Sequence, residues 1–85
     1  MIDEVLMLLE DGHWHTVNEL INHPSIKDWS YTKLQITLEF LAEYKFIAVN
    51  KRPGHNMKMM IIEAKIVPSL QDFLERMKEV ERQEH

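Results

Sequence analysis

Cysteine is absent from this sequence of 85 residues. Its absence excludes disulfide bonds, cysteine zinc sites and thiol nucleophiles. Only two glycines are present, so a glycine-rich phosphate-binding loop is excluded as well. No apolar run approaches the roughly 20 residues that a membrane-spanning helix needs, and the first four residues lack the basic start of a signal peptide. We therefore expect a cytoplasmic protein that has no membrane partner.

The chain is long enough for one hydrophobic core and hence for one domain. Hydrophobic residues make up 45% of it and charged residues 28%, which is typical of a globular protein and not of a disordered one. The net charge of −4 argues against DNA binding by bulk positive charge. This charge is unevenly distributed, however, because residues 1–44 carry −6, residues 45–65 carry +4 and residues 66–85 carry −2. One segment of the chain is thus basic.

Four stretches with apolar residues at helical spacing predict four helices. Two capping patterns mark the starts of the second and third helices: Thr16, with Glu19 three residues later, and Ser30. Ser69 and Asp72 form the same pattern and predict the start of the last helix. The predicted helices cover residues 2–10, 17–23, 31–44 and 70–80.

Two β-prone segments, residues 46–49 and 57–63, flank a predicted turn at residues 51–56. The turn contains Pro53 and Gly54, which commonly mark chain reversals. The two segments therefore predict a β-hairpin. It coincides with the basic segment of the chain.

Three helices followed by a β-hairpin resemble the winged helix-turn-helix fold of small prokaryotic and archaeal transcription regulators. The residues that carry the resemblance are Trp14 to Leu20 at the start of the second helix, and Ser30, Leu34, Leu38, Leu41, Phe46 and Ile47 in the third helix and the first strand. The resemblance implies an α+β, mainly helical fold with a three-helix core and a hairpin wing. It covers about residues 2–66, so that residues 67–85 add a C-terminal helix. One departure is Lys45, where many members have glycine. We expect Lys45 to end the third helix in a less relaxed backbone conformation, unless the turn differs.

The resemblance also implies binding of double-stranded DNA, with the third helix in the major groove and the wing on phosphates or in the minor groove. Polar side chains in the first turns of the third helix fit base or phosphate contacts. Cations that converge on a hairpin fit phosphate contacts, although an exposed hairpin also carries charge for solubility. The residues expected to contact DNA are Tyr31, Lys33 and Gln35 on the third helix and Lys51, Arg52, His55 and Lys58 on the wing.

Ile36 and Phe40 form an apolar pair away from the predicted core face of the third helix, where Glu39 and Glu43 would repel phosphate. We favour burial of this pair beneath residues 26–29 or beneath the last helix. The alternative is an exposed patch that binds a protein, because contiguous exposed apolar area usually marks an interface. In that case the domain is a protein-interaction module and not a DNA-binding one.

The last helix carries a wide apolar stripe. A small core and an added terminal helix together favour a homodimer, in which Phe73 and Met77 are candidate interface residues. The stripe consists of Leu70, Phe73, Leu74, Met77 and Val80.

The five histidines raise the question of a metal site. His13 and His15 would point the same way on an extended stretch, and His23, Asp11 or Glu19 would have to supply a third ligand. Without cysteine and without two histidines one helical turn apart, we expect no metal site. The serines are explained as turn or capping residues, and no nucleophile with a base and an orienting acid appears. We therefore expect neither an enzyme nor a cofactor.

Overall fold

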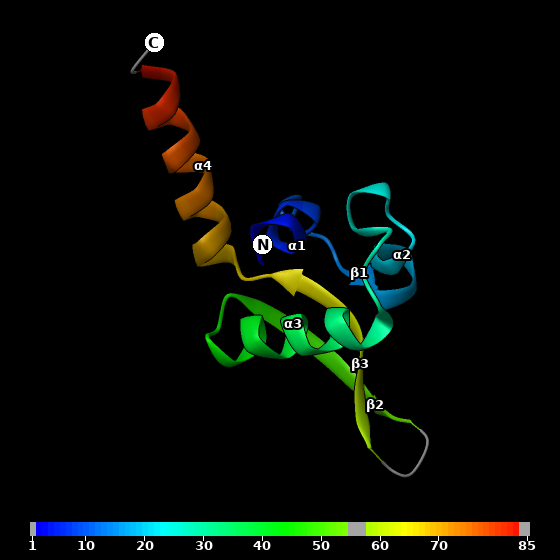
Figure 1. Ribbon diagram of the computed structural model, residues 1–85. Helices are drawn as coiled ribbons and strands as arrows, with labels where there is room; N and C mark the ends of the chain where they lie inside the picture. The colour runs from blue at the N-terminus through cyan, green and yellow to red at the C-terminus, as the bar shows by residue number, and fades with distance from the viewer. Residues whose placement is uncertain (1, 55–57, 84–85) are drawn as a thin grey trace.

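The computed structural model describes residues 2–54 and 58–83, and it has the α+β architecture of a winged helix (Figure 1). His55, which we predicted to contact DNA, lies outside the described residues. The elements are, in chain order, α1 (Ile2–Leu8), β1 (His15–Thr16), α2 (Val17–Ile21), a 3-10 turn η1 (Pro24–Ile26), α3 (Tyr31–Glu43), β2 (Ile47–Pro53), β3 (Met59–Ile66) and α4 (Pro68–Gln83).

The three strands form one antiparallel sheet in the order β1-β3-β2. Pairing in the hairpin runs from Ile47 opposite Ile66 to Pro53 opposite Met59, with one register shift beside Asn50. The strands are therefore longer than predicted, and the predicted turn at residues 51–56 is wrong for its first three residues. Charged side chains are no obstacle to strand pairing when both faces of the hairpin tip are exposed.

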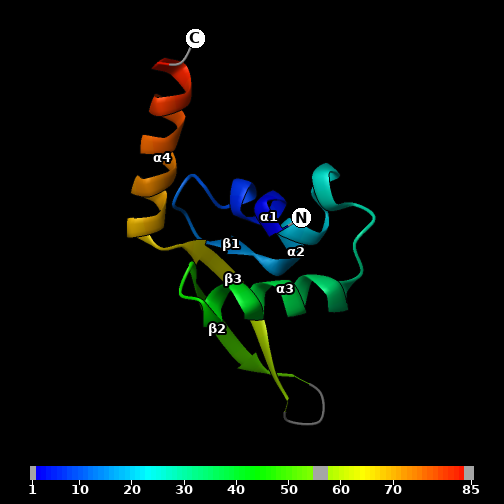
Figure 2. The same ribbon diagram turned by 60° about the vertical axis from the view of Figure 1, so that its left-hand side comes forward.

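The core lies between the sheet and the helices α1, α2 and α3. Leu34, Leu38 and Leu41 are buried on one face of α3, which confirms the predicted core face of this helix. The hairpin extends away from the core on one side, and α4 extends on the other (Figure 2). The remaining buried residues are Val5, Leu9, Val17, Leu20, Ile26, Ile47, Ile61, Ala64 and Ile66.

The two helices of the helix-turn-helix begin as predicted. Thr16 Oγ1 accepts a hydrogen bond from the backbone N–H of Glu19 at 3.1 Å. Ser30 Oγ accepts one from the backbone N–H of Lys33 at 3.0 Å. Each bond satisfies an N–H group that the helix itself leaves without a partner.

The predicted start of α4, at residue 70 with Ser69 as its cap, is wrong by two residues. The helix begins at Pro68, and the backbone N–H groups of Leu70 and Gln71 donate to the carbonyl of Val67. Ser69 therefore lies inside the first turn and does not cap it. Proline is well tolerated at the first helical position because no N–H is needed there.

Lys45 ends α3 in the left-handed backbone region, with φ at 65°. The N–H of Phe46 donates to the carbonyl of Leu41 at 2.9 Å, and the N–H of Lys45 donates to that of Ala42 at 3.0 Å. These two bonds form the Schellman motif that usually contains glycine. The less relaxed conformation expected for Lys45 is thus confirmed.

Helix α4 contacts the rest of the domain from its first turn as far as Lys78. Leu70 and Leu74 pack against the core, and no residue of α4 is fully buried. Glu10 supplies two further contacts, since its backbone carbonyl accepts from Gln71 Nε2 at 3.0 Å and its carboxylate binds Lys78 Nζ at 2.9 Å. The outer half of the helix extends past the body of the domain.

Candidate nucleic-acid interface

Helix α3, from Tyr31 to Glu39, and the hairpin line one open groove of about 340 Å³, and Glu39 gives this groove one acidic side chain. Tyr31 and Thr32 border it from the helix, and Lys58 and Met59 border it from the hairpin. All four side chains are exposed. The structure thus brings together two residues predicted to contact DNA, Tyr31 and Lys58, from elements that are distant in sequence.

Gln35, by contrast, is bound within the protein. Its Nε2 donates to the backbone carbonyl of Ile61 at 2.7 Å, and its Oε1 accepts from the N–H of the same residue at 3.1 Å. Nε2 also lies 3.2 Å from the Tyr31 hydroxyl. The amide that was expected to face the major groove therefore joins α3 to β3. Its backbone partner is 26 residues away, so the local sequence pattern contained no signal for this contact.

Lys33 lies on the opposite flank of α3 from the hairpin groove. Its Nζ is 4.2 Å from the centre of the Trp29 ring, a distance at which a cation is attracted to an aromatic face. The two residues border a second groove of about 310 Å³, which is otherwise lined mainly by aromatic and apolar side chains. This groove had no signal in the local sequence pattern. Its other lining residues are Thr37, Phe40, Leu41, Tyr44 and Phe46.

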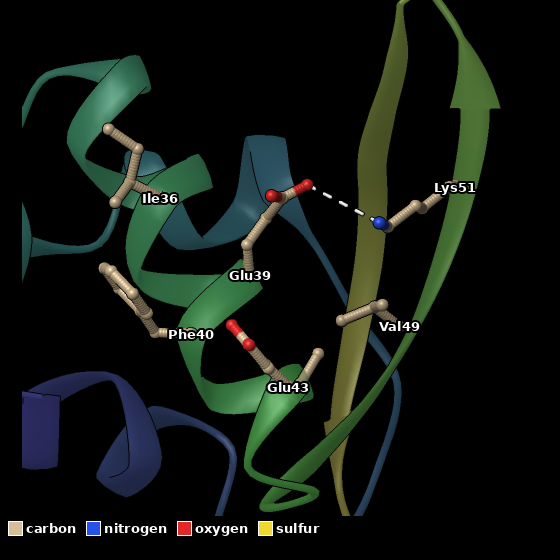
Figure 3. A pocket seen from close by; sticks show the side chains of 7 residues that line it. Ile36, Glu39, Phe40, Glu43, Val49 and Lys51 are labelled. Atoms are coloured by element: carbon tan, nitrogen blue, oxygen red, sulfur yellow. Dashed lines mark ion pairs between the residues drawn. The ribbon is translucent and has the colours of Figure 1, made fainter.

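Lys51 forms an ion pair with an acid of α3. Its Nζ is 3.5 Å from Glu39 Oε1, and both side chains are partly exposed (Figure 3). The pair therefore reduces the positive charge that the wing presents. Arg52 and Lys58 form no ion pair with any other described residue.

The favoured burial of Ile36 and Phe40 is wrong. Ile36 is 51% exposed and Phe40 is 55% exposed. Phe40 points away from the hairpin strands, whereas Glu39 points toward Lys51 (Figure 3), and Ile36 borders the open grooves between α3 and the hairpin. The segment that we expected to cover them turns inward, because Ile26 is buried in the core, and α4 leads away from α3 (Figure 1).

His15 is held between two carboxylates. Its Nε2 lies 2.9 and 3.0 Å from the two carboxylate oxygens of Asp11, and its Nδ1 contacts the carboxylate of Glu19. Burial alone would lower the pKa of His15, but the hydrogen bonds to the two acids outweigh it and raise the pKa. The same contact with His15, aided by the backbone N–H of His13, lowers the pKa of Asp11. A carboxylate only accepts hydrogen bonds, so this arrangement requires a doubly protonated imidazole.

The residues considered for a metal site, His13, His15 and His23 with Asp11 or Glu19, do not form a set of metal ligands in the described structure. The side chains of Asp11 and Glu19, which were considered as further ligands for a metal, are used by His15. Within residues 2–54 and 58–83, no group of three or more suitable side chains could hold an ion.

A short helix, a turn and a longer helix packed beside a paired hairpin define the winged helix-turn-helix class. Residues 4–64 match the family described as helix-turn-helix domain, and the chain belongs to this family. Comparisons with curated proteins and with solved structures found no match. No helix of the described residues has both the length and the apolar character needed to cross a membrane.

Proposed function

We propose that this protein is a DNA-binding transcription regulator that contacts the duplex with the N-terminal half of α3 and with the hairpin. The observation that carries this proposal is the groove shared by Tyr31, Thr32 and Lys58, in a chain that belongs to a helix-turn-helix family. Recognition helices commonly contact bases with their N-terminal residues. Glu43 keeps the second half of α3 from approaching phosphates, whereas the charge of Glu39 is offset by its ion pair with Lys51.

Cations lie on both flanks of this half of the helix. Arg52 and Lys58 are exposed on the hairpin, and Lys33 lies on the far flank beside Trp29. A helix in the major groove has a phosphate backbone on either side, so cations in these positions fit phosphate contacts. Gln35 is not part of the proposed surface, because its amide is bound to Ile61.

The test is fluorescence anisotropy on a random-sequence duplex over a range of salt concentrations. The double variant Arg52→Ala with Lys58→Ala should weaken binding on all sequences and lower the salt slope by about 2, since each lost phosphate contact removes about 0.9. The matched control is Arg82→Ala on α4, which removes an exposed cation far from the hairpin and should leave the slope unchanged. If the wild-type protein binds no duplex even at low salt, the proposal is wrong.

A second candidate is a protein-interaction module. The specific observation in its favour is the exposure of Ile36 and Phe40, whose apolar surface borders Glu39 and Glu43 in an open groove of about 430 Å³. Phe40→Ala should then abolish capture of a protein partner while the far-UV circular dichroism spectrum stays unchanged. This function would be contradicted if Phe40→Ala captured the same proteins as the wild-type protein and also bound duplex DNA equally well.

We also propose that the protein is a homodimer formed through α4. Phe73, Met77 and Val80 lie at helical spacing and are about half exposed, so this apolar stripe along α4 is left uncovered by the described chain. Light scattering at high micromolar concentration should give twice the monomer mass. Met77→Glu should restore the monomer, whereas Glu79→Gln, on the other side of the helix, should not. A monomeric wild-type protein would rule out the dimer.

A further inference from the structure

The solvent face of α3 is apolar where a DNA-reading helix commonly carries amide or guanidinium groups. Ile36 lies at its centre, opposite the buried core face, and Thr32 lies one turn before it; both border the groove that also contains Lys58. Gln35 is bound to β3, and Lys33 lies against Trp29 on the flank. Apart from the hydroxyls of Tyr31 and Thr32, the face of α3 that would meet the bases therefore offers apolar groups, and it presents no free amide or guanidinium group.

We propose that Ile36, together with the methyl group of Thr32, reads the C5-methyl groups of thymine in the major groove, which gives the protein a preference for thymine-containing duplexes. This inference rests on the DNA-binding function proposed above. Thymine is the only standard base with a methyl group on its major-groove edge, and apolar side chains recognise it by contact. Guanine is read mainly by arginine or lysine, and this face has neither.

The charges around Ile36 permit such a contact. Glu39, the acid closest to the hairpin, is paired with Lys51 at 3.5 Å, so its repulsion of a phosphate is offset. Lys58 lies along the same groove as Ile36 and can hold the backbone of the duplex on that side. Glu43 lies about two turns beyond Ile36, which confines close approach to the first half of the helix.

Burial of the apolar surface of Ile36 in the major groove of the duplex is also thermodynamically favourable. Ile36 is half exposed in the protein alone, and its burial against a thymine methyl removes apolar area from water on both sides. One buried methyl group corresponds to about a fourfold change in affinity. Replacement of thymine by uracil removes this methyl group and leaves every hydrogen-bonding group of the base in place.

The experiment compares two pairs of probes by anisotropy: a dA·dT duplex with its dA·dU counterpart, and a dI·dC duplex with its 5-methylcytosine counterpart. Each pair is measured with the wild-type protein and with the Ile36 variants. The wild-type protein should bind dA·dU at least about fourfold more weakly than dA·dT, and methylation of cytosine should strengthen binding by a similar factor. Ile36→Ala should reduce both ratios toward one. Ile36→Val, which keeps two methyl groups, should retain most of the discrimination.

The matched control is Met7→Ala, which truncates a 67% exposed apolar side chain on α1 and should preserve both ratios. Equal wild-type affinities for dA·dT and dA·dU would overturn the inference while leaving the proposed DNA-binding function intact. Full discrimination by a folded Ile36→Ala variant would overturn the assignment to Ile36. Failure of the wild-type protein to bind any duplex would overturn the proposed function and, with it, the inference.

Discussion

The contact between Gln35 and the backbone of β3 leads to a prediction about stability. One side-chain amide pairs with both the carbonyl and the N–H of Ile61, a residue that is fully buried. Gln35→Ala removes both hydrogen bonds at once and leaves two backbone groups of β3 without these partners. The variant should therefore unfold more readily, whether or not DNA is present.

The size of the effect follows from these two bonds. A buried donor or acceptor that loses its partner costs about 1–3 kcal/mol. Because Gln35 is only partly buried, water can replace part of each bond, and we expect a loss of about 2–4 kcal/mol in the free energy of unfolding. For a domain of this length, each kcal/mol corresponds to about 4–8 °C in Tm, so Tm should fall by about 8–32 °C.

Thermal and urea unfolding followed by far-UV circular dichroism measure this loss directly. Thr32→Ala is the control, because Thr32 is exposed on the same helix and should change stability by no more than about 0.5 kcal/mol. The reasoning is refuted if Gln35→Ala is as stable as the Thr32→Ala control. An altered base preference at unchanged stability would instead restore Gln35 to the DNA-contacting residues predicted from the sequence.

Three further predictions concern single contacts. The raised pKa of His15 means that its ion pairs stabilise the fold fully below the pKa of an unfolded histidine, about 6.5, and are lost as pH rises through the folded pKa. The difference in urea midpoint between wild type and His15→Ala should thus shrink from pH 6 to pH 8, and parallel midpoints would contradict the ion pairs with Asp11. Lys45→Gly should stabilise the domain by about 0.5–1 kcal/mol, since glycine adopts the left-handed conformation without strain, whereas Lys45→Ala should not. Glu39→Gln should release Lys51 for phosphate, which tightens duplex binding and raises the salt slope by about 1; an unchanged slope would show that Lys51 stays away from DNA.

The order of elements and the core face of α3 could be predicted because they depend on local patterns. The spacing of Leu34, Leu38 and Leu41 and the capping side chains of Thr16 and Ser30 act within a few residues. The pairing of β1 with β3, in which His15 lies opposite Ala64, joins distant segments and had no local signal.

The candidate site could be predicted only in part. Tyr31 and Lys58 border one groove as the fold suggested, but the partners of Gln35 and Lys51 lie on other elements and depend on how helix and hairpin pack. The exposure of Ile36 and Phe40 depends on the direction of α4, which short-range periodicity does not determine.

Glu10 helps to set that direction, together with the packing of Leu70 and Leu74 on the core. Glu10 holds α4 with its main-chain carbonyl through Gln71 and with its carboxylate through Lys78, two partners 61 and 68 positions further along the chain. In the proposed dimer, the angle of α4 determines how far apart the two copies of α3 lie. The number of base pairs between two half-sites would then depend in part on Glu10, an acidic residue in the turn after α1, where no contact with DNA is expected.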